Sequence, residues 1–341
     1  MKRQALHRRL ALATGAGNNR RVKLSMSAAM PAELVAASLA QRVPLGASGL
    51  AVAPLGWGMW RFAGAAPAIA RARVEAALEI GCTLFDTADI YGAGTSGGFG
   101  AAEQLLGQLL RAEPSLRSRM VLATKAGIRP PLPYDSSADY LIEACEASLR
   151  RLATEQIDLL QVHRPDVLAH PAEVARALET LHRQGKIRAA GVSNYSAAQT
   201  RALMAHLTMP LASIQPEFSA LAIEPLEDGV LDLALEQGLG VLAWSPLGQG
   251  QLAAGAAHGG AGAGDRAGRV SAALDAFAAR RGLDRTILAY SWIMVHPARP
   301  IPLIGSQSPE RIRALGAAYG VAWTRADWYA ILAAARGAPL P

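Results

Sequence analysis

The segment LFDTADIYG, residues 84–92, places a carboxylate and a phenol five positions apart at the end of an apolar run. Leu84 and Phe85 are typical of a buried strand, whereas Asp86 and Tyr91 are polar groups where that strand surfaces. A tyrosine is a poor proton donor at neutral pH because its unperturbed pKa is near ~10. A neighbouring ammonium stabilises the phenolate and lowers that pKa, so a lysine beside Tyr91 would make it a better general acid.

Lys125 is the lysine best placed for this role. The chain contains only four lysines, and Lys125 alone ends an apolar segment, MVLATK (120–125), where a buried charge needs a partner. Asp86 can supply that partner. His163, at the end of DLLQVH (158–163), would donate a hydrogen bond to a substrate oxygen and orient a carbonyl group. Asp86, Tyr91, Lys125 and His163 are therefore the predicted catalytic residues.

The elements that must position these residues follow from the apolar pattern. Eight short apolar segments predict strands, and they lie at 50–56, 82–87, 120–125, 158–163, 188–193, 212–217, 240–245 and 301–306. Stretches of helical period separate them, such as 139–152, where Leu141, Ala144, Cys145, Leu149 and Leu152 share one face. This alternation predicts a single α/β domain, a (β/α)8 TIM-type barrel over residues 42–341. The segment VPLGASGLAVAPLG also predicts a hairpin, turning at Gly49, that plugs the bottom of the barrel.

Polar residues stand where the predicted strands end. In a barrel these ends converge on one mouth, so such residues are candidates for catalysis or ligand binding. They are Asp86, Lys125, His163, Ser193, Asn194, Gln215, Glu217, Trp244, Ser245, Gly305 and Ser306. Two long connections, 126–138 and 247–270, also follow strands, and the Gly/Ala-rich second one is expected to be mobile.

The net charge of +7 is concentrated at the N-terminus. Residues 1–41 hold seven basic residues and one acid, so 42–341 are almost neutral, which argues against nucleic acid as a partner. We expect 1–41 to be a disordered basic extension. No apolar run approaches the roughly 20 residues of a membrane span. The two cysteines, Cys82 and Cys145, exclude a disulfide framework and a Cys-rich metal site, so we predict no metal and a cytoplasmic protein.

The order Asp86, Tyr91, Lys125, His163, in the settings FDTADIYG, LATK and LLQVHRPD, resembles the catalytic tetrad of the aldo-keto reductase superfamily. The resemblance runs from about residue 42 to the C-terminus through GVSN, IQPE and AWSPLGQG, and is closest to the bacterial oxidoreductase branch. It implies an NADP(H)-dependent oxidoreductase that transfers hydride between nicotinamide and the carbonyl or alcohol of an aldehyde, ketone or sugar, with the tyrosine delivering the proton.

The resemblance also implies a cofactor site. The implied contacts are Ser193, Asn194, Gln215 and Trp244 for the nicotinamide, Ser245, Leu247 and Gly248 for the pyrophosphate, and Gly305, Ser306 and Arg311 around the adenosine 2′-phosphate. In GSQSPERI, Ser308 is expected to cap a helix that starts at Pro309, and a helix N-terminus favours an anion. The family often has a basic residue where Gly305 stands, and a Glu-Asn pair where Ala314 and Leu315 stand. These departures leave use of NAD(H) beside NADP(H) open.

Other interpretations stay open at this stage. An NADPH-binding, redox-sensing regulatory subunit with little turnover would keep the same residues, and the basic extension would be its tether. A two-carboxylate hydrolase lacks a second acid in a suitable place. Trp60 is expected to wall the substrate site and Trp57 to pack in the core. An ion pair of Arg164 with Asp166 is expected to brace their loop. The chain is expected to be a monomer or weak homo-oligomer with a small carbonyl or alcohol as its partner.

Overall fold

The computed structural model describes residues 33–255 and 265–340. The chain divides into two units, 1–32 and 33–341, and every described residue belongs to the second. In this part of the chain, eight parallel strands close into a barrel in sequence order, with β11 pairing to β4. The barrel strands are β4 (Gly56–Gly58), β5 (Leu84–Asp86), β6 (Val121–Ala126), β7 (Ile157–Val162), β8 (Ile187–Ser193), β9 (Leu211–Gln215), β10 (Gly240–Ala243) and β11 (Ile301–Ile304). The predicted (β/α)8 barrel is confirmed.

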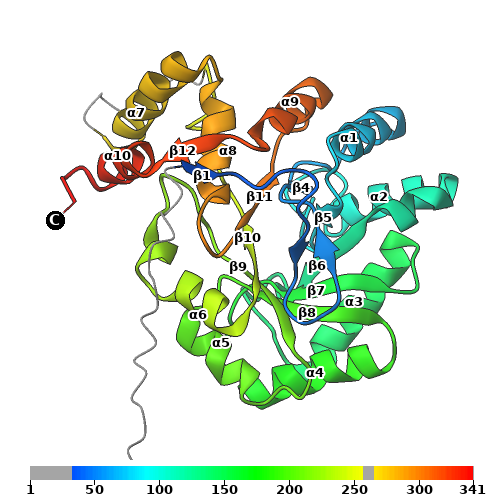
Figure 1. The fold of residues 1–341 in the computed structure, drawn as a ribbon. Helices are drawn as coiled ribbons and strands as arrows, with labels where there is room; N and C mark the ends of the chain where they lie inside the picture. Colours follow the sequence, from blue (N-terminus) through cyan, green and yellow to red (C-terminus); the bar gives the residue numbers. More distant parts are fainter. Residues whose placement is uncertain (1–32, 256–264, 341) are drawn as a thin grey trace, which may run out of the picture. The chain divides into compact units, whose positions relative to one another are not determined.

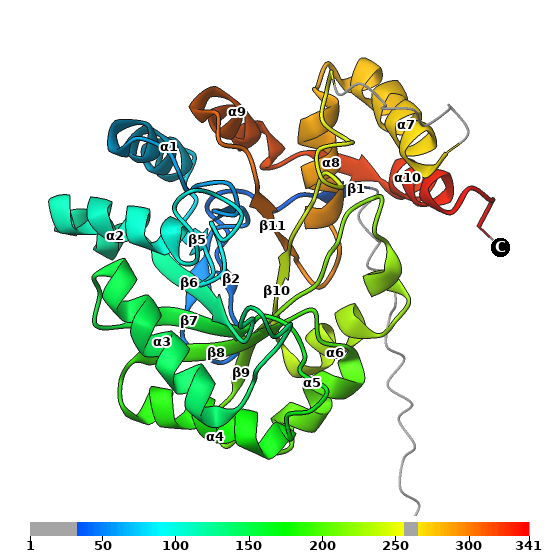
Figure 2. The same cartoon turned by 180° about the vertical axis from the view of Figure 1, so that it is seen from behind.

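Helices surround the strands in both views of the molecule (Figure 1 and Figure 2). They are α1 (Pro67–Glu79), α2 (Ala101–Ala112), α3 (Ala138–Leu152), α4 (Pro171–Arg183), α5 (Ala197–Met204), α6 (Val230–Gln237), α7 (Arg266–Arg281), α8 (Arg285–Met294), α9 (Pro309–Ala314) and α10 (Arg325–Arg336). Short 3-10 helices lie at Pro114–Arg119, Glu224–Leu226 and Leu315–Ala318. The helix expected at 139–152 is α3, and its predicted apolar face is buried except for Leu149, which is partly buried.

A hairpin closes the end of the barrel where the strands begin. Strands β2 (Val43–Pro44) and β3 (Ala51–Val52) pair antiparallel. Their apolar side chains pack against residues near the N-terminal ends of the barrel strands, such as Leu84, Leu159 and Ile301. The predicted plug is therefore confirmed. The first barrel strand was expected at 50–56, but it is β4, because the first residues of that segment belong to the hairpin.

The start of the described chain differs from the sequence expectation. Residues 33–41 were predicted to belong to a disordered extension, yet β1 (Glu33–Val35) pairs antiparallel with β12 (Ala322–Thr324). Both strands lie near α8 and α10 (Figure 1). An edge strand near the C-terminus therefore gives this short segment a partner that the local sequence does not reveal. The remainder of the predicted extension, residues 1–32, lies outside the described residues.

The Gly/Ala-rich connection is shorter than expected at its C-terminal end. It was predicted to run from 247 to 270, but α7 begins at Arg266, where the side chain of Asp265 caps it by accepting a hydrogen bond from Gly268 N. Part of the segment expected to be mobile, residues 256–264, lies outside the described residues.

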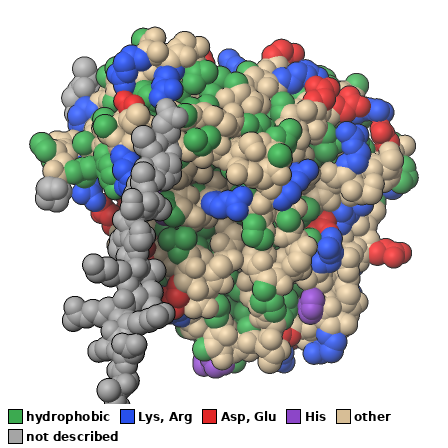
Figure 3. Space-filling view, in the orientation of Figure 1, with side chains coloured by type: hydrophobic (Ala, Val, Ile, Leu, Met, Phe, Trp, Pro, Cys, Tyr) green, Lys and Arg blue, Asp and Glu red, His purple; other side chains and the backbone are tan. Residues whose placement is uncertain are grey.

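Charged side chains of both signs are spread over the surface. Figure 3 shows Lys and Arg side chains on one face, with Asp and Glu side chains among them. Several arginines pair with acids, for example Arg313 with Glu79 at 2.5 Å and Arg280 with Asp327 at 2.6 Å. The balanced composition of the barrel is thus matched by local pairing. Within residues 33–255 and 265–340, no helix is both long and apolar enough to cross a membrane.

Candidate active site

Lys125 lies at the centre of the predicted catalytic residues, on β6, with its side chain fully buried. Its ammonium donates to three oxygens: Asp86 Oδ2 at 2.6 Å, Thr87 O at 2.9 Å and Tyr91 Oη at 3.0 Å. An ammonium has three N–H groups, so all of them are used. Burial lowers the pKa of Lys125, but Asp86 and Tyr91 outweigh burial and leave that pKa raised. The lysine therefore stays charged in the barrel.

Tyr91 accepts the hydrogen bond from Lys125, so its own O–H proton is not used in that contact. The ring is 8% exposed, and its centroid lies 4.8 Å from Lys125 Nζ. Burial raises the pKa of Tyr91, and the charge of Lys125 offsets only part of this rise, so the pKa lies above its ordinary value of 10.0. The sequence argument predicted a lowered pKa because it counted the charge and not the burial. In the free protein the phenol is therefore protonated at neutral pH.

His163 and Trp60 flank the tyrosine ring. The ring centroids of Tyr91 and His163 are 5.9 Å apart, and those of Tyr91 and Trp60 are 5.0 Å apart. Burial, Lys125 and Arg164 hold the pKa of His163 well below its ordinary value of 6.5, so the imidazole is neutral at pH 7. Trp60 is 62% exposed beside Tyr91, whereas Trp57 is fully buried. The structure thus puts Trp60 where a substrate reaching Tyr91 would meet it.

Two buried glutamines hold the carboxylate of Asp86. Gln215 Nε2 donates to Asp86 Oδ1 at 3.0 Å, and Gln161 Nε2 donates to the same oxygen at 3.1 Å. Gln215 was predicted to contact the nicotinamide carboxamide; its nitrogen faces Asp86, and no described residue donates to its Oε1. Gln161 was missed by the sequence analysis. Its signal was a glutamine directly after the apolar pair Leu159–Leu160 of the strand IDLLQV, two residues before His163.

The other predicted nicotinamide residues form one hydrogen-bonded group next to His163. Trp244 Nε1 donates to Asn194 Oδ1 at 3.0 Å. Asn194 Nδ2 donates to Ser193 Oγ at 2.8 Å and to His163 O at 3.1 Å. Ser193 Oγ donates to the backbone oxygen of Gln215 at 3.1 Å. The ends of β8, β9 and β10 therefore meet beside His163.

The predicted pyrophosphate residues lie in one tight turn after β10. Gly248 N donates to Ser245 O at 2.8 Å, and Gln249 N donates to Ser245 Oγ at 2.9 Å. Ser245 and Gln249 have φ values of 55° and 58°, which non-glycine residues seldom adopt. At Gly248 a Cβ would lie 2.5 Å from the end of the Leu221 side chain, and the φ of 53° is one that favours glycine. Leu247 is partly buried against the core.

The segment after β11 begins with the helix start that the sequence predicts. Ser308 caps α9 by accepting a hydrogen bond from Arg311 N at 3.3 Å, and Pro309 is the first helical residue. Ser306 Oγ accepts from Ser308 N at 3.3 Å, which tightens the turn into the helix. These bonds fix the positions of Ser306 and Arg311 relative to each other.

The same segment has unpaired polar groups. Arg311 is exposed, and it has no ion pair among the described residues. Both polar atoms of the Gln307 amide are buried without a hydrogen-bond partner in the described chain. Gly305 is exposed, with nothing within 4 Å of the position that a Cβ would take. The segment 305–311 thus combines an exposed guanidinium without an ion pair and an open glycine, and a guanidinium is a strong donor to anionic groups.

Arg164 and Asp166 do not form the expected ion pair. Asp166 instead accepts from Ser136 N at 2.9 Å and from Leu168 N at 3.0 Å, so it braces two loops through the backbone. The guanidinium carbon of Arg164 lies 5.8 Å from the ring centroid of Trp244. The prediction of a bracing pair was wrong, because backbone N–H groups that the sequence cannot place satisfy the aspartate.

A second buried acid lies in the turn that carries Tyr91. Asp89 is fully buried, and neither carboxylate oxygen has a hydrogen-bond partner among the described residues. Burial, with the nearby charge of Glu103, raises the pKa of Asp89 well above its ordinary value. Glu103 itself accepts from Thr124 Oγ1 at 2.5 Å and from Arg151 Nε at 2.7 Å. Burial therefore favours the protonated form of Asp89, an acid that lies close enough to Lys125 to feel its charge.

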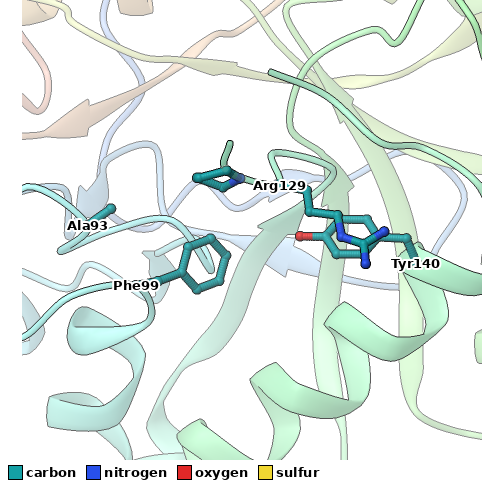
Figure 4. A pocket seen from close by; sticks show the side chains of 5 residues that line it. Ala93, Phe99, Arg129 and Tyr140 are labelled. Atoms are coloured by element: carbon teal, nitrogen blue, oxygen red, sulfur yellow. The ribbon is translucent and has the colours of Figure 1, made fainter. Parts of the chain in front are cut away.

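A side pocket opens between the loops that follow β5 and β6. It has a volume of about 450 Å³ and is lined by Ala93, Phe99, Arg129, Pro130 and Tyr140. Figure 4 shows the rings of Phe99 and Tyr140 on opposite sides, with the Arg129 guanidinium against Tyr140. Arg129 also pairs with Asp135 at 2.7 Å. The loop 126–138, one of the two long connections on the catalytic side, thus contributes to this pocket.

Known proteins match the chain along most of its length. The model of the Aldo/keto reductase family matches residues 54–335. The 6-dehydroglucose reductase of Novosphingobium aromaticivorans is 54% identical over 299 residues, which cover 87% of this chain and 96% of that protein. The 6-dehydroglucose reductase of Agrobacterium fabrum is 36% identical over 293 residues, which cover 82% of this chain and 93% of that protein.

Solved structures match the barrel. The glycerol dehydrogenase of Gluconobacter oxydans superposes with a TM-score of 0.75 at 26% identity, over 88% of this chain and 97% of that one. The holo form of an aldo-keto reductase from Bacillus halodurans also superposes with a TM-score of 0.75, at 27% identity. The match covers 88% of this chain and 98% of that one. The resemblance inferred from the four catalytic settings is confirmed by these matches.

Proposed function

We propose a reaction for this protein from one premise: the chain belongs to the aldo/keto reductase family and is an oxidoreductase that acts on carbonyl or alcohol groups. The proposed reaction is the NADP(H)-dependent reduction of an aldehyde to an alcohol, with 6-dehydroglucose as substrate. Tyr91 is the proposed general acid, and Asp86, Lys125 and His163 assist it.

The observation that carries the proposal is the arrangement of hydrogen bonds at Lys125. Its ammonium binds Asp86 Oδ2 on one side and Tyr91 Oη on the other, at 2.6 and 3.0 Å. Because Lys125 is the donor to Tyr91, the phenolic O–H is left to donate to a substrate. A charged lysine also stabilises the phenolate that forms when the proton leaves. A solely structural ion pair would not require the tyrosine.

The residues divide the reaction between them. A reduced nicotinamide, when bound, supplies a hydride to the carbonyl carbon. Tyr91 gives its phenolic proton to the carbonyl oxygen, so its O–H bond breaks as the O–H of the alcohol forms. Neutral His163 donates a hydrogen bond that orients the carbonyl, while Lys125 stabilises the phenolate. Trp60, edge-on to Tyr91, forms a wall of the substrate site.

The cofactor is proposed to lie across the ends of β8 to β11. Ser193, Asn194, Gln215 and Trp244 would hold the nicotinamide, Ser245, Leu247 and Gly248 the pyrophosphate, and Gly305, Ser306 and Arg311 the adenosine 2′-phosphate. The unpaired groups of the 305–311 segment support a phosphate there. We therefore propose NADP(H) as the preferred cofactor, with NAD(H) bound more weakly.

The Arg311→Ala variant tests this preference. Replacing the guanidinium removes a charge-assisted bond to the 2′-phosphate, so NADPH affinity should fall about tenfold while NADH affinity stays within twofold. Tryptophan fluorescence, with Trp244 as the expected reporter, measures both titrations. Exposed Arg313, on the same helix but paired to Glu79, gives the matched control Arg313→Ala. An equal loss of both nucleotides in Arg311→Ala would contradict the assignment.

The substrate proposal comes from the two 6-dehydroglucose reductases that this chain resembles, at 54% and 36% identity. Purified protein with NADPH should consume the cofactor in the presence of 6-dehydroglucose and release glucose, the corresponding primary alcohol. Glyceraldehyde, xylose and glucose serve as comparison substrates. If the protein turns over glyceraldehyde but not 6-dehydroglucose, the proposed substrate is refuted and the proposed carbonyl reduction is retained. Turnover of no carbonyl compound would refute both.

We also propose that the protein works in the cytoplasm as a monomer or weak homo-oligomer. Cys82 and Cys145 are both free and buried, which suits a reducing compartment. All the proposed catalytic groups come from one chain, so the reaction needs no second copy. Sedimentation of the purified protein, with and without NADPH, measures the oligomeric state.

A further inference from the structure

Gln161 is a buried amide that the proposed reaction does not use. It lies on β7, in register with Lys125 on β6 and with Gly191 on β8. At Gly191 a Cβ would lie 3.2 Å from Gln161 Cγ and 2.2 Å from Ser213 Oγ. The glycine therefore leaves room for the Gln161 side chain, which bonds to Asp86 two strands away on β5.

The orientation of the Gln161 amide is fixed by two bonds of opposite sense. Its Nε2 donates to Asp86 Oδ1 at 3.1 Å, and its Oε1 accepts from Gln215 Nε2 at 3.3 Å. Gln215 Nε2 also donates to Asp86 Oδ1 at 3.0 Å, which closes a ring of three side chains. A flipped Gln161 amide would set oxygen against oxygen and NH2 against NH2. Only one orientation satisfies the ring.

This ring decides which end of Gln215 is free. Its NH2 group is used by Asp86 and Gln161, and none of the described residues donates a hydrogen bond to its Oε1. The free end is therefore an acceptor, and an acceptor suits the NH2 of a primary carboxamide. On the other side, Asp86 Oδ2 remains for Lys125. One buried glutamine thus orients groups that serve both the cofactor and the proton donor.

We propose that Gln161 is a positioning residue that fixes the Gln215 carbonyl toward the nicotinamide carboxamide and the Asp86 carboxylate toward Lys125. The inference rests on the proposed NADP(H)-dependent function and adds to it a residue and a selectivity. The protein should distinguish a cofactor with a carboxamide NH2 from one without it, and that discrimination should depend on Gln161 although Gln161 does not touch the cofactor.

The Gln161→Met variant tests the proposal, because methionine keeps the length of the side chain and removes both bonds. The probes are NADP⁺ and its 3-acetylpyridine analogue, in which a methyl group replaces the carboxamide NH2. Binding is followed by tryptophan fluorescence, so the test does not depend on turnover. Wild-type protein should bind NADP⁺ about tenfold more tightly than the analogue, and Gln161→Met should reduce this ratio to about twofold or less.

The matched control is Ser213→Ala. Ser213 lies in the same barrel interior, beside Gly191, and its buried hydroxyl has no hydrogen-bond partner among the described residues. This control should keep the wild-type ratio. Gln161→Asn, which shortens the amide without adding bulk, should show the same loss as Gln161→Met. A wild-type ratio in either Gln161 variant would overturn the proposal, even if the protein reduces 6-dehydroglucose.

A second readout separates positioning from packing. If Gln161 also orients Asp86, then kcat for aldehyde reduction should fall about tenfold in Gln161→Met at saturating cofactor. The pH at which the rate is half-maximal should shift in the same variant. If kcat stays unchanged while the preference for NADP⁺ over the analogue is lost, Gln161 positions only Gln215. That result would contradict the proposed orientation of Asp86 by Gln161. Loss of binding for NADP⁺ and the analogue alike would indicate packing alone and overturn the inference.

Discussion

Two buried carboxylates lie three residues apart, at the end of β5 and in the turn after it, and their surroundings are opposite. Asp86 receives hydrogen bonds from Lys125, Gln161 and Gln215. Asp89 has no hydrogen-bond partner for its carboxylate among the described residues, and burial raises its pKa well above the ordinary value. Burial alone therefore does not make a carboxylate the counter-ion of Lys125. The hydrogen-bond partners decide which carboxylate holds the cation, and for the carboxylate without them burial favours the protonated form.

Removing the partnered carboxylate should have the larger effect. In Asp86→Asn, buried Lys125 loses its counter-ion, so its charge is no longer held beside Tyr91. We expect kcat for aldehyde reduction to fall about 10²–10³-fold. The free energy of unfolding should fall by about 3–5 kcal/mol, since an uncompensated buried charge remains. Steady-state kinetics and urea unfolding measure the two. A kcat within twofold of wild type would show that the ion pair is only structural.

The pH profile sharpens the comparison at Tyr91, where charge and burial oppose each other. In the proposed reaction Tyr91 must be protonated, so the rate should fall as pH rises through the pKa of Tyr91, which burial places above 10.0. The pKa of His163 lies well below 6.5, so the imidazole does not titrate above that pH. We expect a level kcat between about pH 7 and 9. A descending limb centred near pH 7–8 would mean that Lys125 outweighs burial.

Replacing Asp89, the carboxylate without partners, should have the smallest effect of these changes, and it should raise the stability of the protein instead of lowering it. The pKa of Asp89 is raised in the folded state, so ionisation costs stability as pH rises from the unfolded-state pKa toward the folded one. Asp89→Asn removes this cost and should raise Tm at pH 8 by about 2–4 °C for each kcal/mol gained. The advantage should vanish near pH 4. Calorimetry at both pH values measures it, and a lower Tm at pH 8 would reveal a missed partner.

Much of the site could be predicted because a parallel barrel brings strand ends together. Asp86, Lys125 and His163 each stand at the end of an apolar segment, and in the structure they lie together around Tyr91. Predicting this required only the barrel topology and no information on long-range contacts. The eight strands were found for the same reason, apart from the first. There the apolar run 50–56 spans two elements, because a short irregular segment, 53–55, separates β3 of the hairpin from β4 of the barrel.

The features of the site that the sequence did not predict depend on strand register and on side-chain burial. Gln161 reaches Asp86 because Gly191 is its neighbour on β8, and pairing across strands is invisible in a single chain. The pKa of Tyr91 was predicted in the wrong direction because an exposed fraction cannot be read from a motif. The expected Arg164–Asp166 pair failed because backbone N–H groups of its own loop and of the loop 126–138 bind the aspartate.

The measurement that tests the central claim most directly compares Tyr91→Phe with wild type in a single turnover of 6-dehydroglucose, with NADPH bound beforehand. Phenylalanine keeps the ring against Trp60 and removes only the proton donor. The rate of hydride transfer should fall about 10³-fold while NADPH affinity stays within twofold. A rate close to wild type would contradict the account, because the proton would then come from a group other than Tyr91.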